Sequence, residues 1–403
     1  MRDLLYSDLP DDRQPVIVAA RRSPVARAFG ALSMVEPQDL AAPVIRAVLA
    51  DIGMTADAVD DVILGNATGG GGNIARLSGL TAGLPVGVPG VTVDRQCGSG
   101  LDAIVTACHL VAAGAGSVYL AGGVESTSRA PWRVARPRRP GELPSFFGRA
   151  RFSPDDVGDP DMGVAAENVA ARYGVDRRRQ DAFALQSHRR AVRSQANGVF
   201  DREIVPIATG RGPQVSVDEC PRADTTEAKL AGLPPVFVDG GTVTAGNSCP
   251  LNDGAAVVVV TSLAHARRLG AGRGLLFAGA AAAGVDPNYL GIGPVPSTRK
   301  LLTSHPDLDL ETAAVIEFNE AFAAQVLATL DELKIDETRV NRDGGALALG
   351  HPFGASGAIL ITRIFHQFGT SGGRHDDGDL AFAMIGIGGG MGLSAAFRHS
   401  RLP

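Results

Sequence analysis

Short apolar runs alternate with amphipathic stretches in the first part of the chain. The run Pro15–Ala20 is apolar and rich in β-branched residues, which predicts a buried strand. A helix is predicted over Pro37–Ile52 because its apolar residues share one face; these are Leu40, Val44, Ile45 and Val48. Further short apolar segments predict strands at Asp61–Asn66, Val91–Asp94 and Ser117–Gly123. Strands and helices that alternate in this way predict an α/β protein with a mostly parallel sheet covered by helices.

The C-terminal part of the chain repeats this plan. An apolar strand pattern resumes after Gly254 with the sequence AAVVVVTS. A helix is predicted after Cys97, with a buried stripe made of Leu101, Ile104, Val105 and Cys108. A second helix is predicted after His351, with a matching stripe made of Ile361, Ile364, Phe365 and Phe368. Two glycine-rich turns that are followed by similar helices predict a duplicated fold.

The segment between these parts, residues 129–251, has a different composition. It begins with a loop rich in Pro and Arg, carries a polar helix at Arg177–Ala196 and ends in an irregular stretch rich in Asp, Thr and Pro. We interpret this segment as an insertion that covers the catalytic face. The basic run Arg133–Arg139 is interpreted as a solvated loop, with contact to anionic phosphates as the alternative.

The length of 403 residues predicts two or three domains. With 45% hydrophobic and 20% charged residues, the composition is that of a soluble globular protein. The formal net charge of -5 gives no reason to expect a nucleic-acid partner. No stretch approaches the roughly 20 apolar residues that a membrane-spanning helix needs, and Met1–Gln14 is too mixed for a signal peptide. We therefore expect a cytoplasmic protein without membrane association.

Four cysteines occur in the chain, at Cys97, Cys108, Cys220 and Cys249. Their spacing matches no metal site, and the chain is too long for a small disulfide-rich scaffold. We therefore expect free thiols in a reducing compartment and no bound metal.

Candidate chemistry is concentrated in two turns. Cys97 lies at a strand-to-helix turn, where Gly98 and Gly100 allow close approach of a reacting group. His351 lies at the second glycine-rich turn. A cysteine activated by a distant histidine is the nucleophile-and-base arrangement of covalent acyl transfer. Because Cys97 precedes a helix, we expect the helix dipole to lower the pKa of its thiol.

Each of these residues also has a structural interpretation. A free cysteine is more often buried and inert, which we accept for Cys108 but not for Cys97 beside its glycines. Asn319 could hold a water molecule in the site or could simply cap a helix that begins at Glu320. The other histidines receive no role; examples are His188, His366 and His375.

Several motifs together resemble the thiolase family, in that family's order. The three with chemistry are VDRQCGSGLDAI, EFNEAFAAQ and GGALALGHPFGASGA, and the others are GGVESTSRAP, MGVAAENVA, GTVTAGN, NDGAA and GIGPVPSTRK. The resemblance runs from about Pro15 to Arg398. It implies a thiolase fold, with a duplicated five-layer αβαβα core and an inserted loop domain. The implied N-terminal half is 1–128 with 252–277, the loop domain that covers CoA is 129–251, and the C-terminal half is 278–403.

The resemblance also implies roles for individual residues. Cys97 would carry the acyl group, His351 would take the thiol proton, and Asn319 would hold a water of the oxyanion hole. A second oxyanion site would use backbone N–H groups of Cys97 and of the hairpin near Gly388. Ser248 and Cys249 would line the CoA site.

For ligands and assembly, the resemblance implies a CoA thioester as substrate and no permanently bound cofactor. It further implies a homodimer or homotetramer. We expect the subunits to pair through the apolar segments Val118–Ala121 and Val91–Val93, which lie beside the nucleophile turn.

The sequence departs from the family at three places. The closing Cys-x-Gly-Gly-Gly hairpin of thiolases reads Gly386-Ile-Gly-Gly-Gly390, so the second catalytic cysteine is a glycine. Cys249 stands where the family has a serine, and Asp343 where it usually has an asparagine. Without a base at position 386, three alternatives stay open. They are acyl transfer to a non-carbon nucleophile, a decarboxylative condensation, and a non-catalytic CoA-binding scaffold.

Overall fold

A mixed sheet of ten strands runs through the molecule in the computed structural model, which describes residues 5–210, 212–369 and 375–402. Its N-terminal part has the strand order β1-β8-β5-β3-β4. These strands are β1 (Pro15–Arg22), β8 (Asn252–Ser262), β5 (Val118–Ser126), β3 (Asp61–Gly65) and β4 (Gly90–Val93), and the short β2 (Ala26–Arg27) pairs with β8. All the strands predicted in this part form, and β1 and β5 extend beyond their predicted ends.

The C-terminal part of the sheet repeats the order of the N-terminal part. Its strands are β9 (Arg273–Gly284), β12 (Met391–Arg401), β11 (Leu380–Ile387) and β10 (Val315–Phe318), in the order β9-β12-β11-β10. A parallel bridge from Ile316 to Val340 continues this part, just as β4 continues beside β3. The two parts join where β1 pairs with β9. The matching order confirms the predicted duplication.

The prediction of a mostly parallel sheet is wrong. Parallel pairing occurs only between β3 and β4, β3 and β5, and β10 and β11, and the other pairs of described strands are antiparallel. The reason lies in the connections. A tight glycine hairpin returns β11 directly into β12, and antiparallel strands alone permit so short a link.

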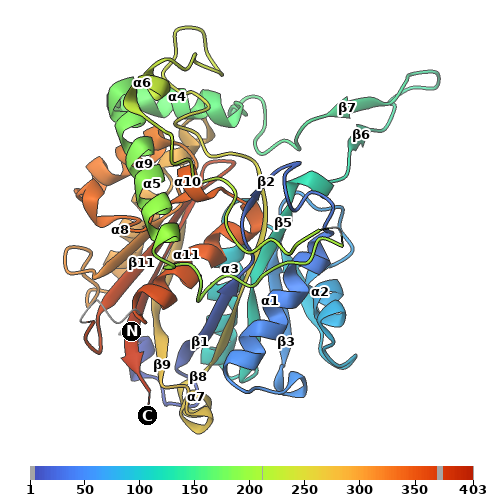
Figure 1. The fold of residues 1–403 in the computed structure, drawn as a ribbon, viewed down its shortest axis with the longest axis vertical. Coiled ribbons are helices and arrows are strands. Elements are labelled where there is room, and N and C mark those ends of the chain that lie inside the picture. The colour runs from blue at the N-terminus through green and yellow to red at the C-terminus, as the bar shows by residue number, and fades with distance from the viewer. Residues whose placement is uncertain (1–4, 211, 370–374, 403) are drawn as a thin grey trace.

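Helices cover both faces of each sheet half, so that five layers result (Figure 1). The outer N-terminal layer contains α1 (Pro37–Asp51) and α2 (Ile74–Ala82), and the outer C-terminal layer contains α8 (Pro294–Ser304) and α9 (Ala323–Leu333). Between the sheet halves lie α3 (Ser99–Ala113) and α11 (Phe353–Gln367). Both predicted stripes are buried there. One apolar cluster fills both interfaces of the central helices, and one further cluster fills each outer interface, which confirms the αβαβα core.

Glycines let the two central helices approach closely at their first turns. A Cβ at Gly100 would lie 2.6 Å from the carbonyl oxygen of Gly354, and one at Gly357 would lie 2.4 Å from the nitrogen of Leu101. Both distances are too short for any side chain. The group that approaches Gly100 is therefore the backbone of α11, which brings the two glycine-rich turns together.

The insertion consists of a helical part and a hairpin. The helices α4 (Met162–Tyr173) and α5 (Arg177–Ala196) lie against the C-terminal half, α4 on α9 and α5 on α9 and α10 (Ala346–Leu349), and α6 (Glu227–Ala231) packs on α5. The hairpin of β6 (Arg133–Ala135) and β7 (Ser145–Phe147) projects away from the rest of the molecule in Figure 1. The remaining helix α7 (Leu263–Leu269) follows β8.

A buried ion cluster ties the insertion to both halves. Arg22 on β1 contacts Glu203 and Asp218, and Arg363 on α11 contacts Glu203 and Asp343. Glu203 and Asp218 belong to the insertion, so one carboxylate bridges the two arginines. The departure at Asp343 has a structural role, because a neutral asparagine could not form its ion pair with Arg363.

The strand Val118–Ala121 cannot supply a sheet-to-sheet contact between subunits. It lies in β5, whose two edges pair with β3 and β8, so that part of the prediction is wrong. The other part, Val91–Val93, lies in β4 at the edge of the sheet, with Val91 exposed. Within the described ranges, no helix is long and apolar enough to cross a membrane, and no cluster of His, Cys, Asp or Glu could hold a metal ion.

Candidate active site

Cys97 lies in a tight turn between β4 and α3. Gln96, which precedes it, has a positive φ of 48°, a conformation that is rare for a residue with a side chain. Two side chains hold this turn. The Gln96 N–H donates to Asp94 Oδ1 at 2.8 Å, and Ser99 Oγ accepts from the Arg95 N–H at 2.8 Å while donating to the Gln96 carbonyl at 2.6 Å. The strained turn presents the thiol at the start of α3.

The pKa of the Cys97 thiol is raised to about 11, which corrects the expectation of a lowered value. Burial is the main cause, and the carboxylates of Glu125 and Asp94 add to it. Backbone N–H groups of Gly388 and of Cys97 itself donate to the sulfur and oppose the rise. The helix N-terminus does not compensate for the lost hydration. Cys97 therefore rests as a neutral thiol at neutral pH.

His351 lies in the turn before α11 and is fixed through its backbone. Gly350 has a φ of +106°, which only glycine adopts easily, and the His351 N–H donates to Asn252 Oδ1 at 2.7 Å. His351 also bridges to Leu251 in a parallel arrangement. Only 1% of the residue is exposed.

The hydrogen bonds of Ser356 select one tautomer of His351. Ser356 Oγ lies 2.6 Å from His351 Nδ1 and 3.0 Å from the carbonyl oxygen of Pro352. The carbonyl can only accept, so the serine proton points to Pro352 and Nδ1 must donate to Ser356. Nε2 then carries the lone pair. Burial lowers the pKa of His351 to about 3, so the imidazole is neutral and Nε2 is free to accept a proton.

Asn319 is not a helix cap, so that interpretation is wrong. Helix α9 starts at Ala323 and its N-cap is Phe322, because the chain runs extended for several residues after β10. The Asn319 N–H donates to the Met384 carbonyl at 3.0 Å, and its Nδ2 lies 3.4 Å from His351 Nε2. The structure therefore brings Asn319 and His351 together, with both side chains buried.

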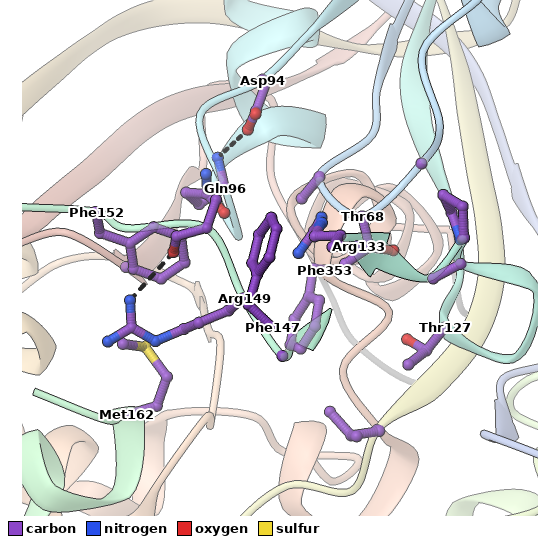
Figure 2. Close-up of a pocket in the computed structure, with 18 of the residues that line it drawn as sticks. Thr68, Asp94, Gln96, Thr127, Arg133, Phe147, Arg149, Phe152, Met162 and Phe353 are labelled. Carbon is purple, nitrogen blue, oxygen red and sulfur yellow. Dashed lines mark hydrogen bonds between the residues drawn. The ribbon is translucent and has the colours of Figure 1, made fainter. Parts of the chain in front are cut away.

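A cavity of about 960 Å³ opens above Cys97 (Figure 2). Gly388 and Phe152 line it together with residues of the β6–β7 hairpin. Phe353 also lines this cavity and packs edge-on against the His351 ring, with 5.0 Å between ring centroids. His351 thus lies one side chain behind the wall of the cavity that holds the thiol.

The predicted CoA residues line a different cavity. Ser248 and Cys249 border a space of about 270 Å³ in the insertion, together with Arg222 and Phe237. The Ser248 hydroxyl donates to the Thr244 carbonyl at 2.8 Å, so its proton is already used. The structure places these residues next to the Asn319 loop, because the Cys249 N–H donates to the Ala321 carbonyl at 2.9 Å.

Gly386 leaves no titratable group at the end of β11. A Cβ built there would lie 3.1 Å from Gln325 Nε2 and 3.2 Å from the Gly291 carbonyl oxygen. Neither neighbour can act as a base, because an amide and a carbonyl do not accept a proton near neutral pH.

Sequence reasoning missed three supporting residues. Ser356 orients His351, Asn252 holds its backbone, and Glu125 accepts hydrogen bonds from the loop after β3 and from the His351 turn. Glu125 receives N–H groups of Ala67 and Gly354 at 2.9 Å each. All three lie inside motifs quoted for the resemblance, so the motifs contained the signal, but no spacing rule assigned a role to it.

Comparisons with known proteins agree with this fold. The family described as thiolase, N-terminal domain, matches residues 15–264, and that described as thiolase, C-terminal domain, matches residues 273–399. VraB of Staphylococcus aureus, named as a candidate acetyl-CoA C-acetyltransferase, is 46% identical over 95% of this chain and 99% of its own length.

Solved structures agree as well. The acetyl-CoA acetyltransferase of Bacillus anthracis has a TM-score of 0.87 with 39% identity, and human mitochondrial 3-ketoacyl-CoA thiolase has a TM-score of 0.87 with 33% identity. Each similarity covers 96% of this chain and 99% of the other. The protein therefore belongs to the thiolase family. Within that family it is a thiolase-like acyltransferase.

Proposed function

We propose that the protein takes acyl groups from CoA thioesters and holds them on Cys97. The observation that carries this proposal is the position of Cys97 in the wall of a large cavity, with Phe353 of the same wall packed against the His351 ring. The backbone N–H groups of Gly388 and Cys97 also act on the thiol, where they oppose the rise of its pKa. Donors in this place would stabilise the negative oxygen that develops when a thioester carbonyl is attacked. The names of the relatives, which specify acetyl-CoA as substrate, support the same reaction.

Acylation then proceeds with the residues of the two turns. The Cys97 sulfur attacks the thioester carbonyl while its proton passes to His351 Nε2. The oxyanion is held by the two N–H groups. When the carbonyl re-forms, the bond to CoA sulfur breaks and the proton returns from His351 to that sulfur, which leaves acyl-Cys97 and free CoA. Asn319 would hold a water beside Nε2, and Ser356 keeps the ring in its productive tautomer.

The insertion 129–251 would hold CoA as a loop domain over the two halves, 1–128 with 252–277 and 278–403. Its smaller cavity, bordered by Ser248 and Cys249, is suited to the pantetheine arm. Arg222 in the same cavity offers a positive charge to the CoA phosphates. This reaction needs no permanently bound cofactor, because the thioester itself is the activated substrate.

The glycine at position 386 favours a second candidate function, which is acyl transfer to a nucleophile other than carbon. A Claisen condensation requires removal of an α-proton, and the described neighbours of this position contain no base. Transfer of the acyl group to oxygen, nitrogen or water needs only the two turns. A decarboxylative condensation is a further variant, because loss of CO₂ generates the carbanion without a base.

Incubation with acetyl-CoA tests the proposal. Intact-protein mass spectrometry should show one acetyl group, and peptide mapping should place it on Cys97. No adduct with any of several acyl-CoAs would favour the scaffold alternative. Release of the adduct by acetyl-CoA, malonyl-CoA, amines or water then identifies the second substrate.

We also propose a homodimer or homotetramer that is formed through the exposed edge of β4, and a cytoplasmic location. The edge strand and exposed Val91 support an intersubunit contact there. Light scattering at micromolar concentration tests this, since a monomeric mass contradicts it.

A further inference from the structure

The cavity above Cys97 is much larger than an acetyl group requires. A non-hydrogen atom occupies roughly the 30 Å³ of a water molecule, so about 960 Å³ admits on the order of thirty such atoms. Its walls include five aromatic residues, which are Trp132, Phe146, Phe147, Phe152 and Phe353. Such a space suits an extended acyl chain in addition to the end of the pantetheine arm.

Two arginines line this cavity, Arg133 and Arg149, and Arg133 belongs to the β6–β7 hairpin. Arg133 lies opposite Phe147 in the β6–β7 hairpin, and residues paired in this way point to the same face of a hairpin. Figure 2 shows the Arg133 guanidinium beside Phe147 and Phe353. Arg133 is partly buried, so its charge has lost part of its hydration.

Arg133 differs from the other arginine of the cavity in its partners. Arg149 is held by Asp159 through two contacts of 2.9 and 3.0 Å and also faces Asp161. Among the residues that the structure describes, no carboxylate lies within 4.0 Å of the Arg133 side-chain nitrogens. The one acid of the cavity wall, Asp94, accepts from the Gln96 N–H and acts on the Cys97 thiol. The guanidinium therefore remains available for an anion from the ligand.

We propose that Arg133 receives a carboxylate at the far end of the acyl chain, so that the preferred substrates are CoA thioesters of dicarboxylic acids. This inference rests on the proposed acylation of Cys97. The aromatic walls cover the methylene chain, and the planar guanidinium binds the terminal carboxylate with two hydrogen bonds. Asp94 disfavours a second negative charge next to the thiol, so the guanidinium of Arg133, which has no carboxylate partner among the described residues, is the favoured place for the carboxylate.

The test compares acyl chains that differ only in the terminal group. The rates of Cys97 acylation by succinyl-, glutaryl- and adipyl-CoA are measured against those of butyryl-, valeryl- and hexanoyl-CoA. We expect at least one dicarboxylic thioester to react roughly tenfold or more faster than its partner of equal chain length, as for a charge-assisted hydrogen bond. Arg133→Leu should remove this preference and Arg133→Lys should keep part of it.

Arg136→Leu is the matched control. It removes the same charge from an exposed residue of the same loop that does not line the cavity, and the preference should persist. Equal rates for each pair in the wild type, or equal loss in Arg133→Leu and Arg136→Leu, overturn the proposal.

A second arm separates the acyl carboxylate from the phosphates of CoA, which offer similar chemistry. The same acyl groups are supplied as pantetheine thioesters, which carry no phosphate. If Arg133 binds the acyl carboxylate, the preference and its loss in Arg133→Leu remain. If the effect of Arg133→Leu disappears with these substrates, the guanidinium binds a CoA phosphate and the proposal is wrong. Acetylation by acetyl-CoA is measured in parallel, because its absence refutes the proposed function itself.

Discussion

The two halves of the molecule place their functional turns at matching positions but in opposite surroundings. Each half delivers a glycine-rich turn to the start of a central helix, α3 or α11. Cys97 is partly exposed and borders a large cavity, whereas His351 is buried and held by Ser356 and Asn252. A duplicated scaffold has thus placed two turns at equivalent positions, of which one lines a cavity and the other is buried.

The electrostatic consequence is a neutral resting pair. Burial raises the pKa of the Cys97 thiol to about 11 and lowers the pKa of His351 to about 3, so neither group is charged at neutral pH. The proton can move only as the new sulfur–carbon bond forms and the oxyanion donors take up charge. Neutral resting groups protect the thiol from unwanted reactions, since the thiolate is the reactive form.

The largest effect is expected from a substitution of Cys97, the more exposed residue of the Cys97–His351 pair. Cys97→Ala should abolish the acetyl adduct and lower any transferase rate by roughly 10⁴-fold or more, because the nucleophile is removed. The measurement is the intact mass after incubation with acetyl-CoA. Cys108→Ala is the matched control, because the Cys108 thiol lies in the apolar core on helix α3, which follows Cys97. This variant should still be acylated on Cys97. An adduct on Cys97→Ala would place the acyl group elsewhere.

Gly386→Cys sharpens the comparison between strands β5 and β11, which correspond in the two halves. The buried acid Glu125 lies near the end of β5, while Gly386, which has no titratable group, lies near the end of β11. A thiol there should raise thiolysis of acetoacetyl-CoA about 10²- to 10⁴-fold, the usual contribution of general base catalysis. The φ of Gly386 is not left-handed, so the backbone accepts a side chain, although Gln325 must shift by a few tenths of an ångström.

Gly386→Ala is the control, because it fills the same space without a base and should not raise the rate. If the wild type already performs thiolysis as fast as Gly386→Cys, another residue supplies the base. Cys249 is the first to examine, because burial raises the pKa of its thiol and Cys97 lies close enough to add to that rise.

Ser356→Ala, which alters the surroundings of the buried His351, should have a smaller effect on the acylation rate. It removes a hydrogen bond to His351 Nδ1, which typically contributes about 0.5–1.5 kcal/mol, so acylation should slow by about two- to tenfold. The loss should fall on the acylation rate rather than on KM, because only the tautomer and orientation of the ring change. Ser356→Thr keeps the hydroxyl and should restore most of the rate. A change confined to KM would contradict this role.

The sequence predicted local features better than long-range ones. The helix at Arg177–Ala196 has the predicted ends, and the stripes after Cys97 and His351 are buried, because helical periodicity is written in neighbouring residues. The antiparallel pairing of β8 with β5, and that of β12 with β9, depend on partners far away in the chain, which periodicity does not encode. The thiol pKa was mispredicted for the same reason, since distant segments create the burial that outweighs the helix dipole.

The smallest expected effect concerns stability and compares β3 with β10. The apolar Ile63 of β3 faces the central helix layer. On β10, the polar Glu317 faces the same layer and accepts a hydrogen bond from Gln367 of α11 at 2.6 Å. Burial raises the pKa of Glu317 to about 8, against roughly 4.3 in an unfolded chain. Between these values the folded protein binds a proton that the unfolded chain lacks, so stability falls as pH rises from about 5 to 8.

Glu317→Gln should therefore gain melting temperature over the wild type, more at pH 9 than at pH 5, by the equivalent of about 1–3 kcal/mol. The exposed Glu311→Gln is the control, with the same charge change and no such pH dependence. Equal gains for Glu317→Gln at both pH values would show that Glu317 is ionised in the folded protein throughout this range.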